Sequence, residues 1–337
     1  MKEAALLVRL LADPAEARAV PPAAWTGLLA AARAEQLIGT LACRLDGLDL
    51  PDPVLALLRD ARAGAAQARM SALWEAEMAR RALEGLRIPV ILLKGTAFVA
   101  AGLSAGIGRS IGDLDILVNR ADLPAVEAAL IAAGWEWVKE DAYDDLYYRQ
   151  WMHELPPLIH RTRDRMIDVH HTILPPTARP TPDAAALVAD SVTLENGLRM
   201  LCPEDMIVHA VAHLFADGDL AGGLRNLWDI DRLLRDFSAE DGFWERLEAR
   251  GRLHQLGKPL ARALRLAERL YGTRVDPDLA GPARVSDALY VRRLLVRDGW
   301  GRQRRPVTRF AFYIRSHWLR MSPLMLARHL WIKARKG

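Results

Sequence analysis

The spacing of apolar and polar residues changes twice along the chain. From residue 1 to about residue 86, Ala, Leu and Arg recur at helical spacing, which predicts one or more long helices. From about residue 87 to residue 175, short apolar runs alternate with turn residues, a pattern typical of strands. We expect strands at 88–93, 113–118, 135–140, 146–160 and 165–174, and an amphipathic helix at 121–135 that ends at Gly134. Beyond the Pro-rich stretch 174–183, helical spacing returns and continues to about residue 295.

This layout predicts an α+β protein with a small mixed β-sheet core embedded in helices. The expected organisation is an N-terminal helical region (1–86), an α/β core (87–175), a C-terminal helical region (176–298) and a basic aromatic tail (299–337). The chain has 337 residues, of which 51% are hydrophobic and 26% charged, so it is expected to be globular and not disordered.

Composition narrows the class of protein further. Two cysteines are too few for a disulfide framework or an all-cysteine metal site. The N-terminal apolar run is too short and too interrupted for a secretory signal, which makes a cytoplasmic location the expectation. The apolar stretch 88–108 contains Lys94 and four glycines, so we expect no transmembrane segment there.

Two aspartates one residue apart are the first candidates for chemistry. Asp113 and Asp115 lie in a predicted strand, where alternate side chains point to the same face. Two carboxylates that close repel each other unless a cation lies between them, and a hard divalent ion such as Mg²⁺ suits such a pair. Asp168, flanked by Ile167 and Val169, is a third acid in an apolar strand. If the three aspartates converge, they predict a two-metal site.

A Gly-Thr step lies upstream of the aspartate pair. Gly95 and Thr96 follow a predicted strand and begin a predicted helix, where glycine permits close approach of a phosphate and the first backbone N–H groups lack helical partners. Lys94 and Arg109 are nearby cations that could bind phosphate oxygens.

The candidate residues described so far resemble the motif of a known superfamily. Lys94-Gly95-Thr96, then Arg109, the Asp113-Leu-Asp115 pair and the later Asp168 resemble the DNA polymerase beta nucleotidyltransferase superfamily. The segments "GDLDILV", "IDVHH" and "HAVAHLF" are similar to the bacterial family of uncharacterised nucleotidyltransferases, and the similarity covers roughly residues 25 to 300. Thr96 stands where serine or glycine is commoner, and the stretch from Gly95 to Asp113 is somewhat long.

The resemblance implies a reaction. It implies a Mg²⁺-dependent nucleotidyltransferase, with Mn²⁺ as an alternative ion, that transfers a nucleoside monophosphate from an NTP and releases pyrophosphate. Asp113 and Asp115 would hold a Mg²⁺ ion on the triphosphate. Asp168 would complete a second metal site and help to deprotonate an acceptor hydroxyl.

The resemblance also implies a phosphate-binding set. Gly95 and Thr96 would bind the outer phosphates, while Lys94 and Arg109, with Ser110 beside it, would contact phosphate oxygens and neutralise charge. The acceptor stays open between a small molecule, a protein side chain and an RNA end. Two other readings also stay open: a catalytically silent nucleotide- or partner-binding module on the same fold, and a toxin-like enzyme that modifies tRNA.

Two further residues could contact the substrate. His170 faces the same side as Asp168 if the strand continues, where it could touch substrate or make a structural hydrogen bond. Arg225 is spaced i,i+4 from Asp229 and could form a helix pair or lie near the nucleotide. His209 and His213 have the spacing of zinc-binding helices, but no third ligand is evident.

Positive charge gathers in the tail. The net charge of the chain is +4, but residues 299–337 contain eight arginines, two lysines and no acidic residue. Five aromatic residues are interleaved with these arginines. A packed helix with a solvated basic face, a surface for anionic lipid and a surface for nucleic acid all fit this composition.

Overall fold

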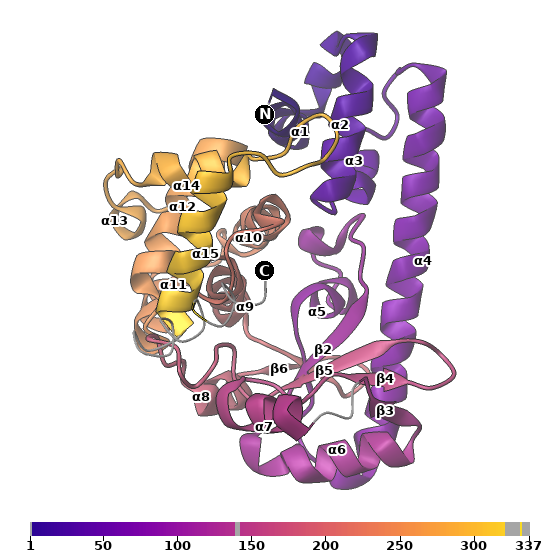
Figure 1. Cartoon of the computed structure of the whole chain (residues 1–337), viewed down its shortest axis with the longest axis vertical. Coiled ribbons are helices and arrows are strands. Elements are labelled where there is room, and N and C mark those ends of the chain that lie inside the picture. Colours follow the sequence, from indigo (N-terminus) through magenta and orange to yellow (C-terminus); the bar gives the residue numbers. More distant parts are fainter. Residues whose placement is uncertain (1, 139–141, 321–330, 332–337) are drawn as a thin grey trace.

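The computed structural model describes residues 2–138, 142–320 and 331. The N-terminal part is helical, as expected. Its elements are α1 (Lys2–Ala12), η1 (Pro14–Ala19), α2 (Pro22–Ala34), α3 (Ile38–Arg44), α4 (Asp52–Leu83) and η2 (Glu84–Leu86). Helix α4 is rich in Ala and Leu, has Asp52 in its first turn and ends on Arg80 and Arg81, charges that complement the helix dipole. It runs from the N-terminal helices down to the sheet (Figure 1).

A seven-stranded mixed sheet lies at the other end of α4, and this confirms the expected α+β class. The strand order is β3-β4-β5-β2-β1-β7-β6. The strands are β1 (Ile91–Leu92), β2 (Asp113–Leu117), β3 (Trp135–Trp137), β4 (Leu158–His160), β5 (Met166–His170), β6 (Val192–Thr193) and β7 (Arg199–Met200). Strands β2 and β5 are parallel neighbours in the middle of the sheet.

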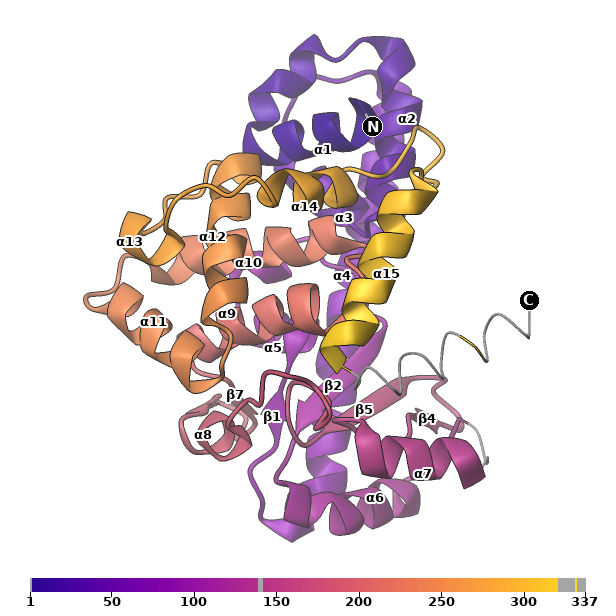
Figure 2. The same cartoon turned by 60° about the vertical axis from the view of Figure 1, so that its left-hand side comes forward.

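Short helices flank this sheet and connect its strands. They are α5 (Lys94–Ala100), η3 (Ser104–Gly106), η4 (Arg120–Asp122), α6 (Leu123–Ala132), α7 (Ala142–Trp151) and α8 (Ala184–Ala189). In both views α6 and α7 lie on the outer side of the sheet, whereas α5 lies on the side that faces the remaining helices (Figures 1 and 2).

The C-terminal part forms a second group of helices. Its elements are α9 (Pro203–Ala212), the π-helix η5 (His213–Asp217), α10 (Gly223–Phe237), α11 (Phe243–Leu253), α12 (Gly257–Tyr271), α13 (Pro277–Ala280), α14 (Asp287–Leu294) and α15 (Pro306–Arg320). One continuous core of buried apolar side chains runs from α1 through the sheet to α15. Within the described residues, no helix is both long and apolar enough to cross a membrane.

The expected strand at 146–160 is wrong over most of its length. Residues up to Trp151 form α7, and only residues 158–160 are a strand. Pairs at i,i+4 spacing explain the helix: Asp145 pairs with Arg149 at 2.8 Å, and the rings of Tyr147 and Trp151 lie 5.7 Å apart. Of the expected strand at 135–140, residues 135–137 form β3, and residues 139 and 140 lie outside the described residues.

The sequence did not reveal β6 and β7, which extend the sheet from within the expected C-terminal helical region. Each has only two residues, too few to leave a periodic pattern. The domain boundaries themselves stay a prediction.

The described part of the basic tail packs against the protein. On α15, Phe312 is buried and its ring lies 5.0 Å from that of Tyr290, while Arg315 donates a 2.8 Å hydrogen bond to the carbonyl of Phe215. Helix α15 lies along the C-terminal helices in both views (Figures 1 and 2). Contact of the tail with lipid or nucleic acid stays a prediction, and residues 321–330 and 332–337 lie outside the described residues.

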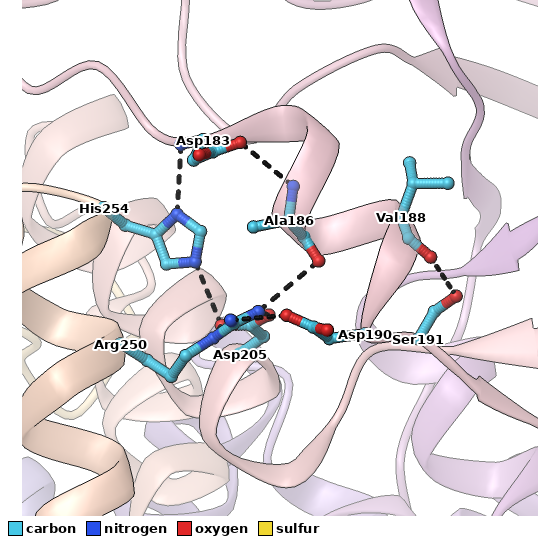
Figure 3. Close-up of polar contacts among 8 residues, drawn as sticks. All are labelled: Asp183, Ala186, Val188, Asp190, Ser191, Asp205, Arg250 and His254. Atoms are coloured by element: carbon cyan, nitrogen blue, oxygen red, sulfur yellow. Dashed lines mark hydrogen bonds and ion pairs between the residues drawn. The ribbon is translucent and has the colours of Figure 1, made fainter.

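A buried polar cluster ties α8, α9 and α11 together (Figure 3). Asp205, fully buried at the start of α9, accepts a 2.7 Å hydrogen bond from Arg250 Nε. His254 Nδ1 accepts a 3.1 Å bond from the Asp183 backbone N–H, which leaves Nε2 to donate to Asp205 at 3.0 Å. Burial alone would raise the pKa of Asp205, but Arg250 and His254 hold it below its usual value.

We expect Asp205→Ala to destabilise the protein by about 3–5 kcal/mol, because it leaves His254 buried without its acceptor and removes the buried one of the two carboxylates that pair with Arg250. Asp190→Ala is the matched control: Asp190 pairs with the same Arg250 guanidinium but is 53% exposed, and its loss should cost less than about 1 kcal/mol. Urea unfolding of both variants measures the difference. Equal losses would show that the buried pair is not what holds these helices together.

Candidate active site

Strands β2 and β5 bring three aspartates to one face of the sheet. The parallel register pairs Asp115 with Asp168, and Asp113 lies two residues before Asp115 on the same face. One carboxylate oxygen from each of the three lies within 4.8 Å of the others. Asp113 is exposed, Asp168 is half-buried and Asp115 is buried. The cluster therefore opens to solvent at Asp113.

Asp115 is a buried charge with two cationic or hydrogen-bonding partners. Lys94 Nζ lies 2.6 Å from its Oδ1, and His170 Nε2 lies 3.0 Å from the same oxygen. Burial opposes the ionised form of Asp115, but Lys94 and His170 outweigh burial and hold its pKa far below the usual range. Burial likewise opposes the charge on Lys94, yet Asp115 raises the pKa of its amine. Asp115 is therefore an anion in the folded protein.

The surroundings of Asp168 favour its protonated form, in contrast to those of Asp115. Burial first, and then the charges of Asp115 and Asp113, raise its pKa to about 7, and Lys94 offsets only part of this effect. Close carboxylates that repel one another and open to solvent form a donor set that can hold a divalent cation.

The Gly-Thr step lies directly beside the aspartates. Lys94, the first residue of α5, has a left-handed backbone (φ 48°), an uncommon conformation for a lysine that accompanies its contact with Asp115. Gly95 is buried, and a Cβ there would lie 2.5 Å from Arg109 Nε. Only glycine thus allows Arg109 to cross the first turn of α5. Thr96 is buried behind it, 1% exposed.

Arg109 links the sheet to the C-terminal helices. It forms an ion pair with Asp229 of α10, and its guanidinium lies 5.5 Å from the ring of Phe98. Ser110, the next residue, is exposed. The contacts of Arg109 with phosphate stay a prediction.

Arg225 is buried and held by the protein itself. It forms an ion pair with Asp229 at 3.0 Å, donates a 2.5 Å hydrogen bond to Thr40 Oγ1, and donates a 2.9 Å bond to the carbonyl of Ala105. The i,i+4 helix pair expected from the sequence is therefore present. A contact of Arg225 with substrate stays a prediction.

A pocket lies between α5 and the C-terminal helices, next to the aspartates. Its lining consists of Lys94, Phe98, Arg109, His209, Ala210, His213, Asn226 and Asp229. Burial first, and then the charge of Lys94, hold the pKa of His209 well below its usual value, so its imidazole is neutral. The i,i+4 spacing of His209 and His213 was a visible signal, but nothing in the sequence placed them beside Lys94. No sequence pattern indicated that Asn226 would line this pocket.

Sequence reasoning missed two residues next to His170. Glu154 forms an antiparallel bridge with His170, and its Oε2 lies 3.4 Å from His170 Nδ1. The His153 ring lies 5.2 Å from the His170 ring. His170 thus makes the structural hydrogen bond that was one of its two expected roles, on the same side as Asp168. The only available signal for Glu154 was an acid within an apolar run, and a mistaken strand assignment hid its register.

Comparison with known proteins agrees with this geometry. A family described as uncharacterised nucleotidyltransferase matches residues 21–272, a stretch that contains the whole sheet, the aspartates and the pocket. No curated protein matches the chain. Since the match spans most of the chain, the protein belongs to the family of uncharacterised nucleotidyltransferases and is a transferase of nucleotidyl groups.

Proposed function

We propose that the protein transfers a nucleoside monophosphate from an NTP to an acceptor hydroxyl and releases pyrophosphate. The observation that carries this proposal is the convergence of Asp113, Asp115 and Asp168 within 4.8 Å, on adjacent strands of a chain that belongs to a nucleotidyltransferase family.

The aspartate cluster fits Mg²⁺, and Mn²⁺ as a second choice. All its ligand atoms are carboxylate oxygens, which hard divalent ions prefer, and its solvent-open side leaves positions for phosphate oxygens and water. Burial, and then the charges of Asp115 and Asp113, raise the pKa of Asp168, and a divalent cation would offset this rise. Asp113 and Asp115 would hold one ion, and Asp168 with them a second. When bound, the ions would neutralise the triphosphate and align it for in-line attack.

The side chains of the protein would accept the proton of the acceptor hydroxyl and keep the cluster charged. The acceptor oxygen forms a bond to the α-phosphorus, the bond from that phosphorus to the bridging oxygen breaks, and pyrophosphate leaves. The hydroxyl proton goes to a carboxylate oxygen of Asp168, the half-buried member of the cluster. Asp115 stays ionised throughout because Lys94 and His170 hold it so.

The phosphates would lie at the first turn of α5, beside the pocket between α5 and the C-terminal helices. The backbone N–H groups of Gly95 and Thr96 lie in the first turn of α5, where no helical acceptor is available to them. Lys94 and Arg109 line the same pocket, although each now pairs with an aspartate, Asp115 and Asp229 respectively. Binding of a triphosphate would therefore compete with two existing ion pairs. The acceptor and the preferred base stay open.

We expect the double variant Asp113→Asn/Asp115→Asn to lose NMP transfer by at least about 1000-fold, because it removes the charge that holds the ions on the triphosphate. The measurement incubates each of four α-labelled NTPs with protein, Mg²⁺ and a cell extract, and follows label on RNA, protein and small molecules. Asp164→Asn is the matched control, since Asp164 is exposed, lies four residues from Asp168 and has a left-handed φ of 53° that asparagine tolerates.

Three outcomes decide between the readings. Transfer by the wild type and by Asp164→Asn, but not by the double variant, supports the proposal. Mg²⁺-dependent NTP binding without any transfer would identify a silent binding module. Neither binding nor transfer would overturn the proposal, and the molecule that carries the label would name the class of acceptor.

We expect Asp168→Asn to be more stable than the wild type at pH 8 in EDTA, by about 2–4 kcal/mol, with a smaller gain at pH 5 and none below about pH 4. Asp168 has a folded pKa of about 7 against an ordinary value of 3.8. Between these values the folded state binds a proton that the unfolded state lacks, so wild-type stability falls as the pH rises towards 7. Asparagine mimics the protonated form and avoids this loss. Urea unfolding at both pH values tests the difference, and an equal stability at pH 8 would contradict the repulsion inferred here.

A further inference from the structure

A second cluster of potential metal ligands lies beside the aspartates. His153, Glu154 and His170 each offer one ligand atom, and these atoms lie within 4.8 Å of one another. Glu154 Oε2 is 3.4 Å from His170 Nδ1 and 4.0 Å from His153 Nε2. His153 and His170 are buried, 7% and 2% exposed. The cluster is thus a compact set of two imidazoles and one carboxylate, shielded from solvent.

The backbone holds these three residues in place. Glu154 and His170 form an antiparallel bridge, and directly opposed residues in such a pair point to the same side. Hydrogen bonds of 2.9 Å flank the bridge on both sides, from Leu155 N–H to the Val169 carbonyl and from His171 N–H to the His153 carbonyl. The segment between α7 and β4 that carries His153 and Glu154 is therefore fixed to the end of β5.

His170 lies between two carboxylates and has a different nitrogen facing each. Nε2 is 3.0 Å from Asp115 Oδ1, and Nδ1 is 3.4 Å from Glu154 Oε2. A neutral imidazole has only one N–H, so it cannot donate to both. When Nε2–H donates to Asp115, Nδ1 faces the carboxylate of Glu154, and a cation between the two atoms would take both as ligands. This is the arrangement of metal-binding histidines, whose second ring nitrogen usually donates to a carboxylate.

We propose that His153, Glu154 and His170 bind a divalent transition-metal ion of the Zn²⁺ type. Two imidazoles and one carboxylate are a common zinc donor set, with a fourth position left for water, whereas Mg²⁺ prefers oxygen ligands alone. Ligand atoms around a tetrahedral Zn²⁺ lie about 3.4 Å apart, given bonds of roughly 2.0–2.2 Å. The distance from His170 Nδ1 to Glu154 Oε2 already has this value, and His153 Nε2 lies somewhat farther from the same oxygen, at 4.0 Å.

Such an ion would act on the aspartate cluster only through His170. With Nδ1 bound to metal, Nε2 carries the proton and donates to Asp115, so the ion fixes the orientation of that carboxylate. His170 is then a positioning residue. The proposal does not depend on the proposed nucleotidyl transfer, because Zn²⁺ binding is measured without nucleotide.

Zn²⁺ titration of tag-free, metal-stripped protein tests the site, by calorimetry in excess Mg²⁺. We expect one Zn²⁺ per chain with micromolar or tighter affinity. His153→Gln and Glu154→Gln should each weaken it by at least about 10–100-fold, the loss that even an outer-shell partner causes. His171→Gln is the matched control: His171 is also buried, but its Nε2 lies 3.3 Å from the Met152 carbonyl, outside the cluster. Asp168→Asn should leave Zn²⁺ affinity unchanged, which separates this site from the aspartates.

Absence of Zn²⁺ binding by the folded wild type would overturn the proposal and leave a doubly protonated His170 as the bridge between the two carboxylates. Loss of binding in Asp168→Asn or His209→Gln, with full binding in His153→Gln, would also overturn it. X-ray absorption at the zinc edge of the Zn²⁺-loaded wild type identifies the ligand atoms of the ion, even where a variant fails to fold. Two imidazoles and a carboxylate oxygen support the proposal, and an all-oxygen shell contradicts it.

Discussion

The carboxylate of Asp115 imposes the constraint around which the core of this protein is arranged. A charge buried in a sheet costs several kcal/mol unless partners compensate for it, and here the partners come from two other segments. Lys94 reaches Asp115 from the junction of β1 and α5, and His170 reaches it from β5. The His170 contact depends on the parallel register of β2 and β5, and the Lys94 contact on the antiparallel pairing of β1 with β2, because a shift of one residue would turn Asp115 to the opposite face. The register of β2 and β5 also places Asp168 directly beside Asp115.

Helices from both ends of the chain support this small sheet. Strands β1, β6 and β7 have two residues each, and such strands have little stability of their own. The helices also reach the site directly. Asp229 of α10 holds Arg109 across Gly95, and Thr40 of α3 accepts a hydrogen bond from the buried Arg225. The pocket next to the aspartates therefore forms only when α5 and the C-terminal helices are assembled, and Thr40 ties α3 to α10, which lines it.

The sequence predicts what depends on local spacing and misses what depends on pairing. The two-residue period of a strand was enough to place Asp113 and Asp115 on one face, and the lone acid at Asp168 could be assigned to a second strand. That β2 and β5 are adjacent and parallel, with Asp115 opposite Asp168, is a long-range fact that no local pattern contains. The i,i+4 pairs of α7 were present in the sequence, but aromatic residues in an apolar run suggested a strand. The error hid Glu154, whose place opposite His170 depends on where α7 ends.

Lys94 and His170 both contact Oδ1 of Asp115, and this shared oxygen relates the two clusters. A carboxylate has two oxygens and about four lone-pair sites, so Asp115 can accept both contacts at Oδ1 and still offer Oδ2 to a cation. The aspartate cluster offers oxygen ligands alone, whereas the His153–Glu154–His170 set offers nitrogen ligands as well, so the two would select different ions. The contact between His170 and Asp115 links them. Lys94 makes the two sides unequal. It compensates the charge of Asp115 without any metal ion, whereas Asp113 and Asp168 have no such close amine among the described contacts. The uncompensated negative charge is therefore concentrated at the solvent-open side of the cluster. A triphosphate could bring a metal ion to this side.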